Sequence, residues 1–182
     1  GIASLEALKE LKKGGIQSYN HNLETARSFY PHVVSTMSWD ERFTTCQHAK
    51  EAGLSLCTGG IFGLGETDEQ RREFIQAIQE LSPMSMPINF YIPHQALPLR
   101  PVSLTPQEAL YWIKYAHEQL PQTMIMLAGG REYLLGKEWT KALEYGAKAI
   151  IIGDYLTVSG ENPHNDLVAL HEAGYYVAKT CM

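Results

Sequence analysis

Residues 50–60 read KEAGLSLCTGG, and this stretch decides the class of fold that the sequence predicts. Its first residues end a helix that we predict over about 39–52, with Ser38 as the N-cap and Gly53 just past the last turn. A short strand, LSLC, follows at once, and a glycine-rich run follows the strand. A helix that leads directly into a short apolar strand is the unit from which parallel α/β folds are built.

The same unit recurs along the chain. We predict helices over about 3–13, 39–52, 67–80, 105–119, 131–145 and 163–173. Between them lie short strands, within 19–24, 54–57, 88–92, 124–128 and 149–152. The helix that follows Thr105 begins with a capping box and has proline at its first position. The strands are roughly 30–35 residues apart, which is the spacing of repeated parallel βαβ units.

Five strands are compatible with two architectures. An open, doubly wound sheet can be built from five, whereas a (β/α)8 barrel needs eight, so the chain would hold about five βα units of an incomplete barrel. No strand is followed by Gly-x-Gly-x-x-Gly at the start of a helix, which leaves little support for a Rossmann fold. The strand at 149–152, AIII, is apolar throughout, so we expect it to be buried on both faces.

Composition excludes several classes of function. The 182 residues suit one domain, and a net charge of -5 offers no basic surface for nucleic acid. No apolar run reaches the roughly 18–20 residues of a membrane span, and no leader precedes the first helix. Three scattered cysteines (Cys46, Cys57 and Cys181) do not form a disulfide framework, so we expect a reducing, cytoplasmic location.

The first strand carries an unusual row of polar residues. Strand residues alternate between faces, so Asn20, Asn22 and Glu24 should point to one side, and His21 and Leu23 to the other. A buried core disfavours such a row, because each unpaired polar group costs about 1–3 kcal/mol. The row is therefore either a strand that runs out into a polar loop, with a capping side chain, or one wall of a binding site.

The other strands also end in polar or glycine residues. Cys57 and the run 58–66 follow the second strand, Asn89 lies on the third, and 129–132 and 153–155 follow the last two. Because the working residues of parallel α/β folds lie at the carboxyl ends of the strands, we expect one ligand site on one face. The glycines in 59–65 are either a loose connection or a backbone surface against which a ring can lie flat.

The cysteines and His21 have to be weighed against structural roles. A lone cysteine in an apolar strand is more often an inert, buried hydrophobe than a ligand, and Cys46 on its helix fits that description. Cys57 differs, because it lies at a strand end directly before glycines. His21 has no second histidine or cysteine at ligand spacing nearby, which argues against a zinc site. No residue is assigned a catalytic role from the sequence.

Four stretches resemble the biotin synthase family: YNHNLET (19–25), LCTGGIFGLGET (56–67), PIN (87–89) and AGGRE (128–132). They occur in the order and at spacings compatible with that family, and the resemblance covers essentially all of the chain. The first motif is highly specific, whereas the glycine pattern within 59–66 is shared more widely among radical S-adenosylmethionine (SAM) enzymes.

The resemblance implies a (β/α)8 barrel with two iron–sulfur clusters, of which residues 1–182 would be the C-terminal part of a single barrel domain. It implies that a [4Fe–4S] cluster cleaves SAM to a 5′-deoxyadenosyl radical, that this radical attacks dethiobiotin, and that a [2Fe–2S] cluster supplies sulfur. An electron donor such as flavodoxin or ferredoxin, a homodimer and a cytoplasmic location are further expectations from the family.

Residue by residue, the resemblance makes Cys57 a ligand of the [2Fe–2S] cluster. It makes Asn22 and Glu24 hydrogen-bond partners of the SAM ribose, and it places Ile61 against the adenine. A carboxylate grips a ribose diol well, and a thiolate is the natural ligand of cluster iron.

For the substrate, the resemblance places Asn20 and Asn22 near dethiobiotin and Asn89 at its ureido ring. Carboxamides suit an uncharged ureido group, because they donate and accept hydrogen bonds without adding charge.

The sequence departs from the family in two respects. The Cys-x-x-x-Cys-x-x-Cys motif of the [4Fe–4S] cluster is absent and would lie before Gly1. Met126 stands where many members have an arginine cluster ligand, and Arg131, at another position, is not assigned in its place. Two alternatives therefore remain: another radical SAM enzyme with a different substrate, or a degenerate half-barrel that binds a nucleoside-like ligand without catalysis.

Overall fold

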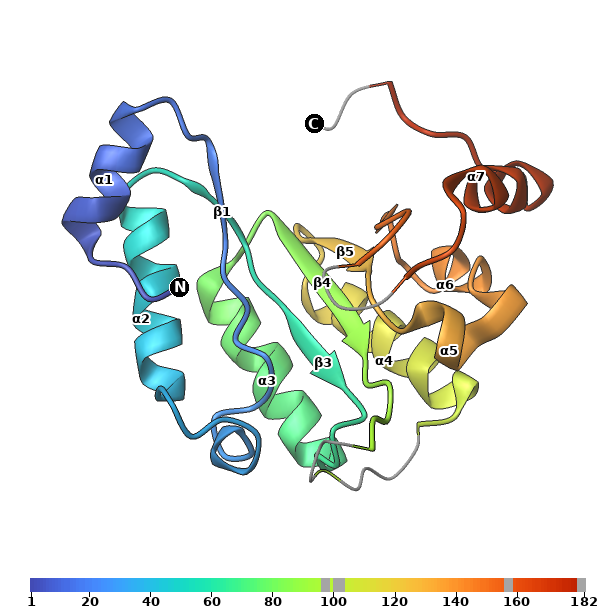
Figure 1. Cartoon of the computed structure of the whole chain (residues 1–182), viewed down its shortest axis with the longest axis horizontal. Helices are drawn as coiled ribbons and strands as arrows, with labels where there is room; N and C mark the ends of the chain where they lie inside the picture. The colour runs from blue at the N-terminus through green and yellow to red at the C-terminus, as the bar shows by residue number, and fades with distance from the viewer. Residues whose placement is uncertain (96–98, 100–103, 156–158, 180–182) are drawn as a thin grey trace.

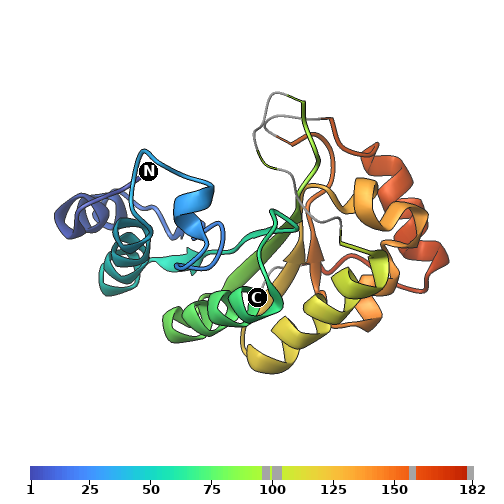
Figure 2. The same ribbon diagram turned by 90° about the horizontal axis from the view of Figure 1, so that it is seen from below.

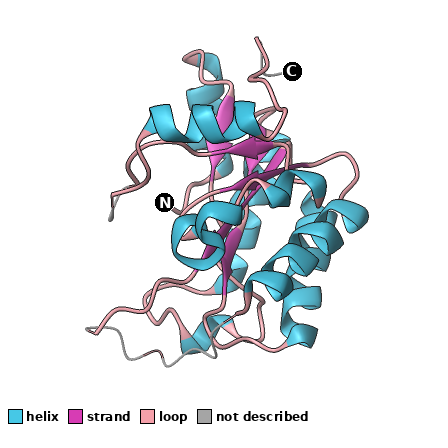
Figure 3. Ribbon diagram, turned by 90° about the vertical axis from the view of Figure 1, so that its right-hand side faces the viewer, coloured by secondary structure: helices cyan, strands magenta, loops and turns pink. Residues whose placement is uncertain are grey.

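A computed structural model describes residues 1–95, 99, 104–155 and 159–179; Cys181 lies outside these ranges. Its strands form one parallel sheet in the order β1-β2-β4-β5-β6, with β3 paired to β4 (Figure 1). The strands are β1 (Ser18–Asn20), β2 (Ser55–Cys57), β3 (Gly60–Phe62), β4 (Ser85–Phe90), β5 (Met124–Leu127) and β6 (Ala149–Ile150). They lie side by side as one twisted sheet (magenta in Figure 3).

The helices alternate with these strands along the chain. They are α1 (Leu5–Lys13), α2 (Trp39–Glu51), α3 (Asp68–Leu81), α4 (Pro106–Gln119), α5 (Arg131–Leu135), α6 (Lys141–Glu144) and α7 (Pro163–Glu172). Short 3-10 turns occur at η1 (Tyr30–His32) and η2 (Gly136–Glu138). The starts of α2, α3 and α4 each carry a capping box, in which a Ser or Thr N-cap and a Glu or Gln three residues later satisfy each other's backbone N–H groups.

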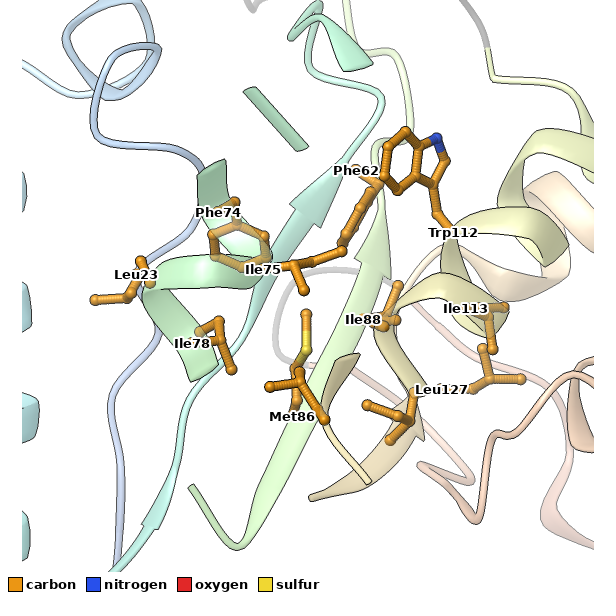
Figure 4. Packing of buried hydrophobic residues seen from close by; sticks show 14 of the residues in the cluster. Leu23, Phe62, Phe74, Ile75, Ile78, Met86, Ile88, Trp112, Ile113 and Leu127 are labelled. Carbon is orange, nitrogen blue, oxygen red and sulfur yellow. The ribbon is translucent and has the colours of Figure 1, made fainter. Parts of the chain in front are cut away.

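The core lies between one face of the sheet and the helices. Figure 2 shows α3 and α4 side by side along that face. Side chains from these helices pack against alternate residues of the strands (Figure 4): Phe74, Ile75, Ile78, Trp112 and Ile113 from the helices, and Phe62, Met86, Ile88 and Leu127 from the strands. Each strand residue in this set is at most 1% exposed. We call this side of the sheet the helix-covered face, and the opposite side the inner face.

Strands β2 and β3 are two parts of one strand that is interrupted at Thr58 and Gly59. Cys57 pairs with Ser85 and Gly60 pairs with Ile88, so the offset along β4 is the same before and after the break. The residue of β4 at the level of Gly59 is Pro87, which has no N–H to donate. The interruption in the ladder therefore coincides with the missing proline donor.

The glycines at this break are required by neighbouring backbones. A Cβ on Gly59 would lie 2.0 Å from the carbonyl oxygen of Pro87, and a Cβ on Gly60 would lie 2.2 Å from the carbonyl oxygen of Glu24. The alternative that this run is a loose connection is thus wrong for residues 60–62, which form β3, and the alternative that a ring lies against it stays a prediction. Gly59 and Gly60 are needed because they have no side chain, which lets the neighbouring strands approach closely. The formation of a turn does not explain these two glycines.

Most predicted elements are confirmed, and four differ. The first strand, expected within 19–24, is β1 and ends at Asn20. Strand β4 starts at Ser85 rather than Ile88. Pro87 fits inside the strand because the neighbouring strand is interrupted beside it, between β2 and β3. The helix expected over 131–145 is divided into α5, η2 and α6 around Gly136, whose φ is +54°.

The prediction that 149–152 is buried on both faces is also wrong. Only Ala149 and Ile150 form β6, and Ile151 and Ile152 are 37% and 42% exposed. These residues are exposed because β6 is the last strand in the order and, among the described residues, pairs with β5 on one side only. None of the helices within the described ranges is long and apolar enough to cross a membrane.

We predict that Gly59→Ala lowers the free energy of unfolding by about 2 kcal/mol or more, because its Cβ would overlap backbone that has no room to move. Gly14→Ala is the matched control: a Cβ there meets nothing closer than 3.4 Å, and we expect a change of at most about 1 kcal/mol. Urea unfolding followed by circular dichroism measures both. Equal stabilities of the two variants would contradict the close approach of Gly59 to the carbonyl of Pro87.

Candidate functional site

The polar residues predicted to form a site lie on the inner face. In a parallel sheet, paired residues on neighbouring strands point to the same side. Asn20 pairs with Cys57, and Ile61 pairs with Asn89. Asn20 is exposed, and the other three are half-buried, unlike the alternate residues of the same strands under the helices. The structure therefore places these four residues on the same face as two pairs, Asn20 with Cys57 and Ile61 with Asn89.

The alternation predicted for the first strand is confirmed. His21 is 5% exposed and Leu23 is fully buried on the helix-covered face, whereas Asn22 and Glu24 are half-buried and continue the row that begins at Asn20. Burial, with smaller contributions from the Arg42 guanidinium and the N-terminal amino group, lowers the pKa of His21 to about 4. His21 is therefore a neutral residue of the core near neutral pH.

Asn20 contacts the sulfur of Cys57. Its carboxamide Nδ2 donates a hydrogen bond to Cys57 Sγ over 3.2 Å. Cys57 is a free thiol, and so is the fully buried Cys46, whose pKa burial raises to about 11. The structure thus separates the two described cysteines as the sequence suggested, with Cys57 at the inner face and Cys46 in the core.

Asn22 and Asn89 hold the interrupted strand from its two sides. Asn22 Oδ1 accepts a hydrogen bond from the N–H of Gly59 over 3.2 Å. Asn89 Nδ2 donates to the carbonyl of Gly60 over 3.1 Å, and its Oδ1 accepts from the N–H of Gly129 over 3.0 Å. The Asn89 carboxamide therefore uses one donor and one acceptor position within the protein, and the Asn22 carboxamide uses one acceptor position.

Glu24 occupies a strained backbone position at the end of the row. Its φ is +70°, in the left-handed region that costs a non-glycine residue about 1–2 kcal/mol. Neighbouring groups fix this conformation: its N–H donates to the carbonyl of Gly59, and its carbonyl accepts from the N–H of Ile61. Strain of this kind is common where a side chain has to be aimed at a ligand.

Arg42 on α2 is a site residue that the sequence did not reveal. Its Nε donates to the Tyr30 hydroxyl over 2.7 Å, and its Nη1 donates to the carbonyl of Asn22 over 2.8 Å and to Glu24 Oε1 over 3.3 Å. The Arg42 and Glu24 side chains are 15% and 24% exposed. Burial raises the pKa of the Glu24 carboxyl above its ordinary value, and the Arg42 guanidinium offsets part of that rise. A single arginine within a helix gave no signal of this contact.

The loop after β3 is fixed by a second ion pair. Glu66, which is 6% exposed, accepts hydrogen bonds from the N–H of Gly63 over 2.7 Å and from Arg71 Nε over 2.8 Å. Arg71 also pairs with Asp68 over 2.8 Å. The carboxylate that ends the glycine motif is therefore engaged inside the protein, where it holds the turn that follows Ile61.

Residues 128–132 make contacts with Tyr155 and with α7, in the C-terminal part of the chain. Arg131 is fully buried, pairs with Asp166 of α7 over 2.6 Å and lies 4.6 Å from the ring centre of Trp139. Glu132 accepts a hydrogen bond from the Tyr155 hydroxyl over 2.9 Å. Arg131 thus has a structural partner, in agreement with leaving it out of the ligand set.

Met126 lies on β5 opposite Pro87, half-buried at the inner face. Among the residues that the structure describes, no group of three or more His, Cys, Asp or Glu side chains could hold a metal ion. A cavity of about 480 Å³ lies at the opposite, amino-terminal ends of the strands and is lined by none of the candidate residues. The candidate site is therefore a surface of the sheet.

We predict that Arg42→Met lowers the free energy of unfolding at pH 7 by about 2–3 kcal/mol, because it leaves the Glu24 carboxylate buried without its partner. The loss should shrink as the pH falls through the raised pKa of Glu24, since the protonated carboxyl needs no counter-charge. In a Glu24→Gln background the pH-dependent part should vanish. Arg27→Met, which breaks the exposed Arg27–Asp40 pair, is the control and should cost less than about 1 kcal/mol. A pH-independent loss for Arg42→Met would contradict the pairing.

Two family models match consecutive parts of the chain. Residues 1–78 match the Radical SAM superfamily, and residues 87–176 match the Biotin and Thiamin Synthesis associated domain. Biotin synthase from Nitratiruptor sp. is 55% identical over 181 residues, and biotin synthase from Aliarcobacter butzleri is 54% identical. Both matches cover 100% of this chain but only 65% and 64% of the relatives, so the chain spans about two thirds of their length.

A solved structure agrees with the fold. Methylornithine synthase superposes with a TM-score of 0.80 at 18% identity, over 98% of this chain and 57% of that one. The parallel sheet with helices on one face is thus part of a (β/α)8 barrel. With two consecutive family matches, and with relatives at 55% identity along its whole length, the chain belongs to the biotin synthase family of the radical SAM superfamily.

Proposed function

We propose that this chain is the C-terminal part of a biotin synthase, which converts dethiobiotin to biotin by SAM-dependent radical sulfur insertion. One observation carries the proposal: the family's motif residues Asn20, Cys57 and Asn89 lie on the same face of the sheet although 69 positions separate the first from the last. Relatives at 55% identity that bear this name support the reaction and the substrate.

The carboxamide of Asn89 would bind the ureido ring of dethiobiotin, with Asn20 and Asn22 near the substrate. Asn22 and Asn89 are held in place by the sheet. Each side chain is oriented by backbone partners on neighbouring strands, Gly59 for Asn22 and Gly60 with Gly129 for Asn89. The remaining N–H and lone pairs are thereby aimed in fixed directions before the substrate arrives. Such preorganisation reduces the entropy lost on binding.

Glu24 and Asn22 would hold the ribose of SAM. The Arg42 guanidinium offsets part of the rise in the pKa of Glu24 that burial causes, and an ionised carboxylate accepts hydrogen bonds from both hydroxyls of a ribose. Ile61 is half-buried beside Asn89 on the neighbouring strand and presents the apolar surface that an adenine ring needs.

Cys57 fits one ligand position of an iron–sulfur cluster. Its thiol is free, half-buried and at the inner face, and its sulfur accepts a hydrogen bond as a thiolate does. A [2Fe–2S] cluster bound there would supply the sulfur atom. Its other ligands, and those of the [4Fe–4S] cluster, would come from parts of the protein other than the described residues. At the place of the family's arginine ligand, Met126 offers a thioether instead.

The remaining family expectations are also proposals. They comprise an electron donor such as flavodoxin or ferredoxin, a homodimeric enzyme and a cytoplasmic location, where the free thiols of Cys46 and Cys57 would stay reduced.

We predict that the full-length protein, reconstituted anaerobically with iron and sulfide, converts dethiobiotin to biotin in the presence of SAM and a reductant. Mass spectrometry of the product measures the conversion. Cleavage of SAM to 5′-deoxyadenosine without any biotin would contradict the proposed substrate. No cleavage of SAM at all would contradict a radical SAM activity.

We predict that Cys57→Ala in the full-length protein abolishes the [2Fe–2S] absorption and biotin formation, because the cluster loses a thiolate ligand. Cys46→Ala is the matched control, since its thiol lies in the core and not at the inner face. The control should retain both the absorption and the activity. A Cys57→Ala protein with the wild-type absorption would show that the sulfur of Cys57 is no ligand.

A further inference from the structure

We infer that Asn20 is a positioning residue for the sulfur of Cys57, and that its N–H···S hydrogen bond raises the reduction potential of an iron–sulfur cluster bound there. The inference rests on the proposed role of Cys57. It gives Asn20 a task other than substrate binding, one directed at the cluster ligand.

The register of the sheet sets the contact. Asn20 and Cys57 are paired residues at the ends of β1 and β2, and the N–H of His21 donates to the carbonyl of Cys57 over 3.0 Å. The two Cα atoms are thus held side by side, with both side chains on the inner face. From this position Asn20 Nδ2 reaches Cys57 Sγ at 3.2 Å, a normal distance for a hydrogen bond to sulfur.

Asn20 differs from Asn22 and Asn89, the other two asparagines of the candidate site. Asn22 and Asn89 use their carboxamides to satisfy backbone groups within the sheet, so their substitution would disturb the fold. Asn20 is exposed, and the partner of its N–H is the side chain of Cys57. A change of this side chain therefore removes the contact with the Cys57 sulfur rather than a hydrogen bond to the backbone of the sheet.

The electrostatic consequence follows from the charge on sulfur. Reduction by one electron adds negative charge to the cluster and its thiolate ligands, and a donor at the sulfur stabilises that charge. The hydrogen bond stabilises the reduced cluster more than the oxidised cluster, so the reduction potential of the cluster rises. The bond also restricts rotation of the Cys57 side chain, and hence the direction in which the sulfur presents its lone pairs.

The test uses the full-length, reconstituted protein with Asn20→Leu, which keeps the size of the side chain and removes the donor. Redox titration with dithionite should give a more negative [2Fe–2S] potential than in the wild type, and the sulfur-to-iron charge-transfer absorption should shift, at unchanged iron content. Asn20→Gln, which keeps a donor, should recover part of both shifts. Ser18→Ala, an exposed change on the same face of β1, should cause neither.

Each outcome decides the inference. Iron lost from Asn20→Leu but kept in Asn20→Gln would support the positioning role, whereas iron lost from both would overturn it. A potential and an absorption that do not change in Asn20→Leu, while Cys57→Ala abolishes the cluster, would overturn the inference and leave the proposed function intact. A cluster that survives Cys57→Ala would overturn both.

Discussion

The constraint on which the rest of the structure depends is the close approach of Gly59 to Pro87 in the middle of the sheet. At this level β2 and β3 separate, and Gly59 comes so close to Pro87 that no side chain fits. On its other side, Gly59 is bound by residues of the candidate site: its carbonyl accepts hydrogen bonds from the N–H groups of Leu23 and Glu24, and its N–H donates to the Asn22 side chain. The order of the strands and the order of the candidate site therefore depend on the same few hydrogen bonds.

One face of the sheet packs against helices in the core, and the opposite face carries the residues of the candidate site. Alternate residues of every central strand are packed under α3 and α4, and the remaining ones form the inner face. Three asparagines on that face have distinct environments, because Asn22 and Asn89 satisfy backbone groups and Asn20 meets a sulfur. Identical side chains thus acquire different chemical roles from their neighbours across the strands.

Sequence patterns predicted much of this arrangement. The capping box before α4, the Ser38 N-cap of α2 and the alternation from Asn20 to Glu24 are local features, and the structure has them as expected. The division of residues 131–145 and the exposure of Ile151 were not predicted. The first depends on one glycine conformation inside an otherwise helical pattern, and the second depends on the place of β6 in the strand order, which apolar composition does not encode.

The sequence by itself determined the unit of the fold, the face on which the candidate residues lie and the family to which they point, because these follow from periodicities of two and 3.6 residues and from contiguous motifs. Only the tertiary structure decided which side chains meet. Arg42 reaches Glu24 from a separate helix, and Asn20 meets Cys57 across 37 positions of sequence. Such contacts depend on strand register and helix placement, since these set the distances between residues far apart in the chain.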